Sequence, residues 1–172
     1  YFSHGVAIER EKRCQFFFNK IRGAKKIALE WKEKGDSHLL GEQTLLTFSY
    51  SLNELESVPE WIFSASHLAI LEPSDQKNGR RLLKLREELL KQGYFLWAPC
   101  THQQICPLLS HSRKDWCHHR FDRPDMPIWF SELERSLPMK NRDLSYSYLL
   151  ASRRKPPEEL SHWARVTGEL LE

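Results

Sequence analysis

The chain has 172 residues, of which 40% are hydrophobic and 28% charged, and this composition is typical of one globular domain rather than of a disordered protein. Four cysteines are too few for a disulfide scaffold and indicate a reducing compartment or a metal site. The net charge of +3 is compatible with a nucleic-acid partner without requiring one, and no apolar run reaches the roughly 20 residues of a membrane span.

Strands and helices are predicted to alternate along the chain. The apolar patterns predict strands at 4–9, 44–50, 67–71, 94–98 and 144–150, helices at 10–22, 59–64 and 80–92, and a terminal helix from Glu158 onward. The helix at 80–92 is the best defined, because its leucines recur every three or four residues, Asp75 or Asn78 can cap its start, and Gly93 suits its end. This alternation predicts an α/β fold with a mostly parallel sheet covered on both faces.

Polar residues follow three of the predicted strands, at Glu9, at 49–54 and at 72–75. In open parallel sheets, ligands bind in the crevice beyond the carboxyl ends of the strands. A cofactor site is therefore expected among these residues.

Residues 99–138 show no helical or strand periodicity, and they contain Cys100, Cys106 and Cys117 in the spacing C-x5-C-x10-C. Thiolates are ligands for zinc and for iron–sulfur clusters, and a segment this long without regular structure needs something to order it. The spacing therefore predicts a metal site on which the order of the segment depends. The spacing does not choose the metal. Three cysteines with one histidine would bind a zinc ion, whereas an iron–sulfur cluster prefers a fourth cysteine. Cys14, on the first predicted helix, is expected to be a small buried residue.

Five segments occur in the order found in a known family. They are S-Y-S-L-N-E-L at 49–55, A-I-L-E-P-S at 69–74, A-P-C-T-H-Q-Q-I-C-P-L at 98–108, D-W-C-H-H at 115–119 and L-S-Y-S-Y-L-L-A-S-R-R at 144–154. Over residues 5–172 the chain resembles the methyltransferase-like family of small-ribosomal-subunit assembly factors, whose members include mitochondrial ribosomal proteins of the Rsm type and bacterial proteins regarded as rRNA methyltransferases.

The resemblance implies a class I methyltransferase fold, which is Rossmann-like and binds S-adenosylmethionine, with a Cys-rich metal-binding insertion. The implied division is a partial core at 1–98 that lacks its first strand, the insertion at 99–143, and the last strand with a C-terminal extension at 144–172. Because the Gly-rich turn expected upstream is absent and the chain begins with Tyr1, we expect a piece of a longer protein that binds the cofactor weakly by itself.

The resemblance also suggests functional residues. Glu9 matches the acid that holds the ribose hydroxyls of the cofactor, although an acid there can equally stabilise a helix start. Cys100, Cys106 and Cys117 match three of four ligands of a 4Fe-4S cluster, with the fourth expected beyond Glu172. The alternative is zinc, with His102, His118 or His119 as the fourth ligand.

Catalysis is left open by the resemblance. Ser49, Asn53 and Glu54 are weak candidates for contacts with the methyl acceptor, because polar residues follow the strand at 44–50. They lack the Asn/Asp-Pro-Pro-aromatic form of enzymes that methylate base amino groups, and Asn53 and Glu54 can instead cap the next helix.

The expected partners are the small ribosomal subunit and its rRNA, without a membrane. Nine basic and four acidic residues between Glu9 and Lys34, and a second basic run at 153–155, can neutralise phosphates. The leading hypothesis is a methyltransferase-like protein of ribosome assembly, located in the bacterial cytoplasm or, in a eukaryote, in mitochondria. The alternatives are a non-catalytic iron–sulfur rRNA-binding assembly factor and a zinc-stabilised interaction domain.

Overall fold

The computed structural model describes residues 3–22, 28–122, 128–138, 143–158, 160, 162 and 163. The chain forms two compact units, residues 1–40 and residues 41–172, which are described separately below. Among the described helices, none is both long enough and apolar enough to cross a membrane.

In the first unit, strands β1 (His4–Ile8) and β2 (Ala28–Lys32) pair in parallel, and helix α1 (Lys12–Arg22) connects them. The 3-10 turn η1 (Ser37–Leu39) follows. Strand β2 was not predicted, although Leu29 and Trp31 alternate with charged residues in A-L-E-W-K. The α1 side chain Phe18 meets Trp31 of β2, with ring centroids 5.4 Å apart.

The prediction that Cys14 is buried is wrong, because its side chain is exposed in this unit. The aromatic contact of α1 with β2 is made by Phe18, and Cys14 lies one helical turn nearer to the start of the helix. The apolar spacing of a helix does not show which of its turns are buried against other parts of the protein.

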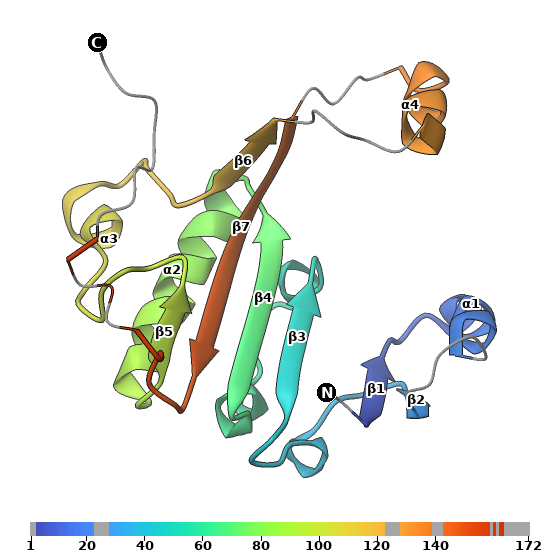
Figure 1. Cartoon of the computed structure of the whole chain (residues 1–172), viewed down its shortest axis with the longest axis horizontal. Coiled ribbons are helices and arrows are strands. Elements are labelled where there is room, and N and C mark those ends of the chain that lie inside the picture. The colour runs from blue at the N-terminus through green and yellow to red at the C-terminus, as the bar shows by residue number, and fades with distance from the viewer. Residues whose placement is uncertain are drawn as a thin grey trace. The chain divides into compact units, whose positions relative to one another are not determined.

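In the second unit, the main sheet has the order β3-β4-β7-β5, and β6 also pairs with β7 (Figure 1). The strands are β3 (Leu45–Ser49), β4 (His67–Pro73), β5 (Phe95–Ala98), β6 (His119–Asp122) and β7 (Asp143–Ser152). Strands β3 and β4 are parallel, whereas β7 is antiparallel to β4, β5 and β6. The α/β class is confirmed. The sheet is mixed rather than mostly parallel in its pairing, because β7 inserts in the opposite direction between β4 and β5.

The core lies on one face of this sheet, where helix α2 (Gln76–Lys91) packs against β4, β5 and β7 (Figure 1). Buried residues alternate along β3 (Leu46, Phe48) and β4 (Leu68, Ile70), and leucines of α2 are buried as well. The expected cover on both faces is therefore wrong for the described residues, because such alternation is typical of a sheet with one buried face.

Helix α2 begins at Gln76, four residues before the predicted start. The carboxylate of Asp75 accepts a hydrogen bond from the N–H of Asn78 at 3.0 Å, so Asp75 is the N-terminal cap. At the other end Gly93 has a φ of 80°, the left-handed conformation that ends many helices.

Short elements lie elsewhere in this unit. The 3-10 turns η2 (Leu52–Glu54) and η3 (Glu60–Ser64) connect β3 to β4. Residues 99–138, predicted to lack regular structure, contain α3 (Pro107–His111), β6 and α4 (Ile128–Arg135). The helix predicted from Glu158 onward falls largely outside the described residues.

Candidate functional site

Helix α2 binds the cysteine-containing segment near its first turns. The side-chain amide of Gln76 donates to the carbonyl oxygen of Lys114 at 2.6 Å. The guanidinium of Arg80 donates to the carbonyl oxygens of Asp115 and Ser112 at 2.7 and 3.1 Å. Polar side chains of α2 therefore fix the backbone of a segment in which the sequence offers few apolar anchors.

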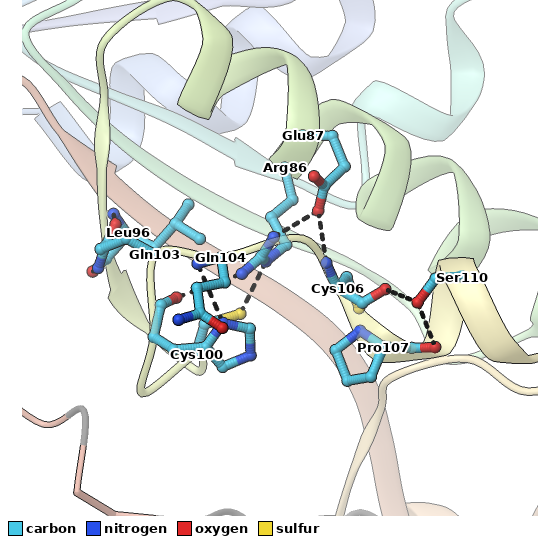
Figure 2. A network of polar contacts seen from close by, with 10 residues as sticks. Arg86, Glu87, Leu96, Cys100, Gln103, Gln104, Cys106, Pro107 and Ser110 are labelled. Carbon is cyan, nitrogen blue, oxygen red and sulfur yellow. Dashed lines mark hydrogen bonds and ion pairs between the residues drawn. The ribbon is translucent and has the colours of Figure 1, made fainter.

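Arg86, one helical turn and a half further along α2, is only 1% exposed. Figure 2 shows Arg86 between Cys100 and Glu87. Its Nε donates to the sulfur of Cys100 at 3.1 Å, its Nη2 donates to the carbonyl oxygen of His102 at 3.2 Å, and its Nη1 pairs with the carboxylate of Glu87. The same carboxylate accepts the backbone N–H of Cys106 at 3.0 Å. Two of the three predicted metal ligands are thus held by adjacent residues of one helix.

This network shifts two pKa values. Burial disfavours the charge of Arg86, but the sulfur of Cys100 and the carboxylate of Glu87 outweigh burial and raise the pKa of the guanidinium. Burial, with the nearby Arg86 cation, lowers the pKa of His102. The Nδ1 atom of His102 accepts the N–H of Gln104 at 3.1 Å, so a metal bond through Nδ1 would displace this contact.

The third cysteine, Cys117, is placed by its neighbours. Its carbonyl oxygen accepts the hydroxyl of Ser147 on β7 at 2.8 Å. The indole of the preceding Trp116 donates to the carbonyl oxygen of Ser74 and lies against Gly79 of α2, where a Cβ would overlap with the ring. The missing side chain at Gly79 is therefore what lets this end of the segment approach the helix.

Cys100 and Cys117 line one small cavity together with Arg86, whereas Cys106 is connected to this place through Glu87. None of the four cysteines, all of which are described, forms a disulfide. Within the described residues, no three His, Cys, Asp or Glu side chains form a group that could hold a metal ion. Cysteine sulfurs are donors of the kind that zinc and iron–sulfur clusters take, and the shared metal stays a prediction.

The other two histidines considered as ligands lie beside aromatic rings. His118 lies beside the Trp116 ring at 5.4 Å between centroids. His119, on β6, lies beside Tyr148 of β7 at 4.7 Å between centroids.

The carboxyl ends of β3 and β4 form a second polar cluster. Glu72, 3% exposed, accepts the N–H of Leu52 at 3.0 Å. The side-chain amide of Asn53 satisfies both neighbours when its nitrogen faces Tyr50 and Glu72. In that orientation the nitrogen lies 3.1 Å from the carbonyl oxygen of Tyr50 and 3.3 Å from Oε2 of Glu72. Tyr50 has a φ of 53°, in the left-handed region, and its ring is partly exposed. Burial raises the pKa of Glu72, although backbone N–H groups oppose that rise.

The catalytic candidates lie at this edge in different surroundings. Ser49 and Glu54 are exposed, whereas Asn53 is engaged within the turn between Tyr50 and Glu72. Arg81 of α2 donates to the carbonyl oxygen of Leu55 at 2.8 Å and so fixes the far end of the turn. Asn53 therefore contacts neighbouring residues of the protein, and its role toward a methyl acceptor stays a prediction.

Glu9 follows β1 in the first unit. Its carboxylate accepts the N–H of Glu11 at 2.7 Å, and its own N–H donates to the carbonyl oxygen of Lys32 at 3.0 Å. This geometry serves the start of α1, and the ribose role stays a prediction.

Two open clefts border the segment at 102–104. One, of about 870 Å³, lies between the second half of α2 and α3 and is lined by Glu87, Lys91 and His111 among others. The other, of about 480 Å³, is lined by Phe95, Trp97 and Lys155, and it reaches Cys100. The side of the segment opposite the core is thus accessible.

The sequence carried a signal for the burial of two charged residues: Arg86, which was not predicted as a functional residue, and Glu72, which was predicted only as part of the polar stretch at 72–75. Arg86 lies between Leu82, Leu85 and Leu89 on the apolar stripe of α2, and Glu72 lies at the next inward position after Leu68 and Ile70 on β4. A charged residue at a core position requires a buried partner, so such positions point to a site.

Known proteins were compared with the chain. A family model described as "Mitochondrial small ribosomal subunit Rsm22" matches residues 14–170. A search of curated proteins finds no match.

Proposed function

Because the chain belongs to the Rsm22 family of the mitochondrial small ribosomal subunit, we propose that it is a methyltransferase-like protein that binds S-adenosylmethionine and acts on small-subunit rRNA in ribosome assembly. The observation that carries the proposal is the strand order β3-β4-β7-β5, with a polar cluster where β3 and β4 end. In a eukaryotic source the proposed compartment is the mitochondrion, and in a bacterium it is the cytoplasm.

The strand order supports a class I methyltransferase fold. Sheets of that fold are parallel except for one antiparallel strand inserted next to an edge strand, and β7 between β4 and β5 has this arrangement. The 99–143 segment then lies between β5 and β7 as an insertion. The turn held by Glu72 and Arg81 lies beyond the carboxyl end of β3, where a ligand of such a sheet is expected.

The charge of the first unit supports an rRNA partner. Residues 1–40 contain nine Lys and Arg against five Asp and Glu, whereas the rest of the chain contains 17 against 18. On α1, Lys20 lies over the ring of Phe16 at 4.6 Å, and this ring is 60% exposed. Cations beside an exposed aromatic ring suit phosphates and unstacked bases.

We propose that the three cysteines of the second unit hold a 4Fe-4S cluster, with zinc as the alternative. Such a group would join β5, α3 and β6 through Cys100, Cys106 and Cys117, and would supply a cross-link rather than chemistry at the acceptor. Residues of α2 bind the sulfur of Cys100 and the backbone N–H of Cys106, and Ser147 of β7 binds the carbonyl oxygen of Cys117.

A non-catalytic assembly factor is the second candidate function. It is favoured by the engagement of Asn53 with Tyr50 and Glu72, which leaves that amide in contact with the protein rather than available to a substrate. In this case the fold binds the cofactor and rRNA without transferring a methyl group.

Titration of the full-length protein with S-adenosylmethionine tests cofactor binding. Glu9→Ala should weaken binding by about 1–3 kcal/mol, the effect of losing a charged hydrogen-bond acceptor. Glu33→Ala, on an exposed acid of the same unit, is the control. Equal affinities of all three proteins would remove Glu9 from the site, and no binding by the wild type would contradict the cofactor proposal.

Incubation of the full-length protein with small subunits and methyl-labelled S-adenosylmethionine separates the two functions. Label in the rRNA supports the methyltransferase. Co-sedimentation with the subunit without label supports the assembly factor. Absence of both contradicts the proposed partner.

A further inference from the structure

Arg86 is an arginine within the core of the molecule, between leucines that pack against the sheet. Burial of a cation is unfavourable unless each donor finds a partner. All three of its contacts are to Glu87 or to the segment that contains the cysteines. The hydrogen bonds of its guanidinium therefore fix that segment on α2.

The 100–106 segment is held at further points that involve no metal. The amide of Gln103 donates to the carbonyl oxygen of Leu96 at 2.9 Å and accepts its N–H at 2.8 Å, in the manner of an added strand residue beside β5. Glu87 holds Cys106 through its backbone rather than through its sulfur, so that thiol stays available for bonding. The protein thus orders, through its own hydrogen bonds, a segment whose order was expected to depend on a metal.

We propose that Arg86, with Glu87, is a positioning residue for the cysteine site: it places Cys100 and Cys106 before any metal binds, and its N–H bond to the Cys100 sulfur raises the reduction potential of the bound cluster. The second part rests on the proposed function, because it needs iron at the cysteines. The first part does not.

The direction of the potential follows from electrostatics. Reduction adds negative charge to a cluster and its sulfur ligands, and a cationic N–H donor 3.1 Å from one of those sulfurs stabilises the reduced form more than the oxidised form. Low exposure strengthens the effect, because little water screens a guanidinium that is 1% exposed. Loss of the donor should therefore shift the potential to a lower value.

Hydrogen exchange in metal-free full-length protein tests the first part. The amide of Cys106 should be protected in the wild type and should exchange at least tenfold faster in Glu87→Ala. Glu88→Ala, which changes the neighbouring exposed acid, is the matched control and should exchange like the wild type. A Cys106 amide that is unprotected in the metal-free wild type and becomes protected only with iron or zinc would overturn the positioning role.

Redox titration of the anaerobically purified full-length protein tests the second part. Arg86→Lys keeps the charge but cannot make all three contacts, so it should retain less iron and titrate at a lower potential than the wild type. Lys84→Arg, on the exposed face of the same helix, should change neither value. An Arg86→Lys cluster with wild-type iron content and potential would overturn this part.

The two proposals fail in distinguishable ways. Wild-type protein without iron contradicts the proposed cluster and the effect on potential, while protection of Cys106 in the same metal-free protein still supports the positioning role. Wild-type protein with iron but without metal-free protection supports the cluster and contradicts the positioning role.

Discussion

The carboxylate of Glu72 on β4 accepts the backbone N–H of Leu52 at 3.0 Å, a contact between residues 20 positions apart in the chain and both buried. Glu72 belongs to the same inward row as Leu68 and Ile70, so an acid occupies a place that the pattern of β4 gives to an apolar residue. The contact fixes the turn that follows β3, where the candidate acceptor residues lie.

Glu72 should make the stability of the chain depend on pH. Burial raises the folded pKa of Glu72 above its ordinary value of 4.5, so the folded state binds more protons than the unfolded state between these two pKa values. The contribution of Glu72 to the free energy of unfolding should therefore fall as pH rises from about 4.5 through the folded pKa. Urea unfolding at several pH values should show this fall in the wild type and not in Glu72→Gln.

Glu54→Gln, on an exposed acid of the same turn, is the control and should keep the wild-type pH dependence. Parallel stability curves for the wild type and Glu72→Gln would show that burial does not perturb the carboxyl of Glu72.

Gly79→Ala should destabilise the chain although alanine favours helices. The helical preference contributes about 1 kcal/mol, but the new Cβ overlaps with Trp116, and overpacking costs about 1–3 kcal/mol. Thermal unfolding of Gly41→Ala supplies the control, because a Cβ there makes only an ordinary 3.6 Å contact with Thr44. If Trp116→Ala does not reduce the effect of Gly79→Ala in a double-mutant cycle, the overlap is not its cause.

Asp75→Ala should remove the N-terminal cap of α2 and lower the free energy of unfolding by about 0.5–2 kcal/mol at neutral pH. Asp75→Asn should retain most of the cap. Slight burial opposes ionisation, but hydrogen bonds from Asn78 outweigh it and lower the pKa of Asp75 below 3.8. The stabilisation from the charge of Asp75 is therefore fully present above pH 3.8 and is lost as pH falls through the folded pKa. Equal acid sensitivity of the wild type and Asp75→Asn would contradict this charge-dependent stabilisation.

Metal analysis of anaerobically purified full-length protein should find about four irons per chain, as a cubane cluster requires. Replacement of Cys100, Cys106 or Cys117 by Ser should lose the iron, because each thiolate would bind one iron atom. Cys14→Ser is the control, since this exposed residue belongs to the other compact unit. One zinc without iron would identify the alternative site with a histidine ligand.

Local pattern determined much of the fold. Several features are properties of neighbouring residues and were predicted close to their places: the leucine spacing of α2, the left-handed Gly93 and the apolar runs of β3, β4 and β5. For the cap of α2 the sequence left Asp75 and Asn78 open, and the structure has Asp75. The order of five sequence segments was sufficient to identify the family, and the family match over residues 14–170 confirms it. Residue type and spacing likewise pointed to the three cysteines and to the sheet-edge residues Ser49, Asn53 and Glu54.

Only the tertiary structure decided which of these residues act together. A sequence pattern carries no strand direction, so the antiparallel place of β7 between β4 and β5 could not be predicted from its apolar run. Helix α3 contacts α2 and strand β6 pairs with β7, and these partners of the segment at 99–122 lie far away in the chain. Arg86 and Glu72 acquire their roles in the same way: a buried charge is stable only beside its partners, and its partners at Cys100 and Leu52 are brought to it by the fold.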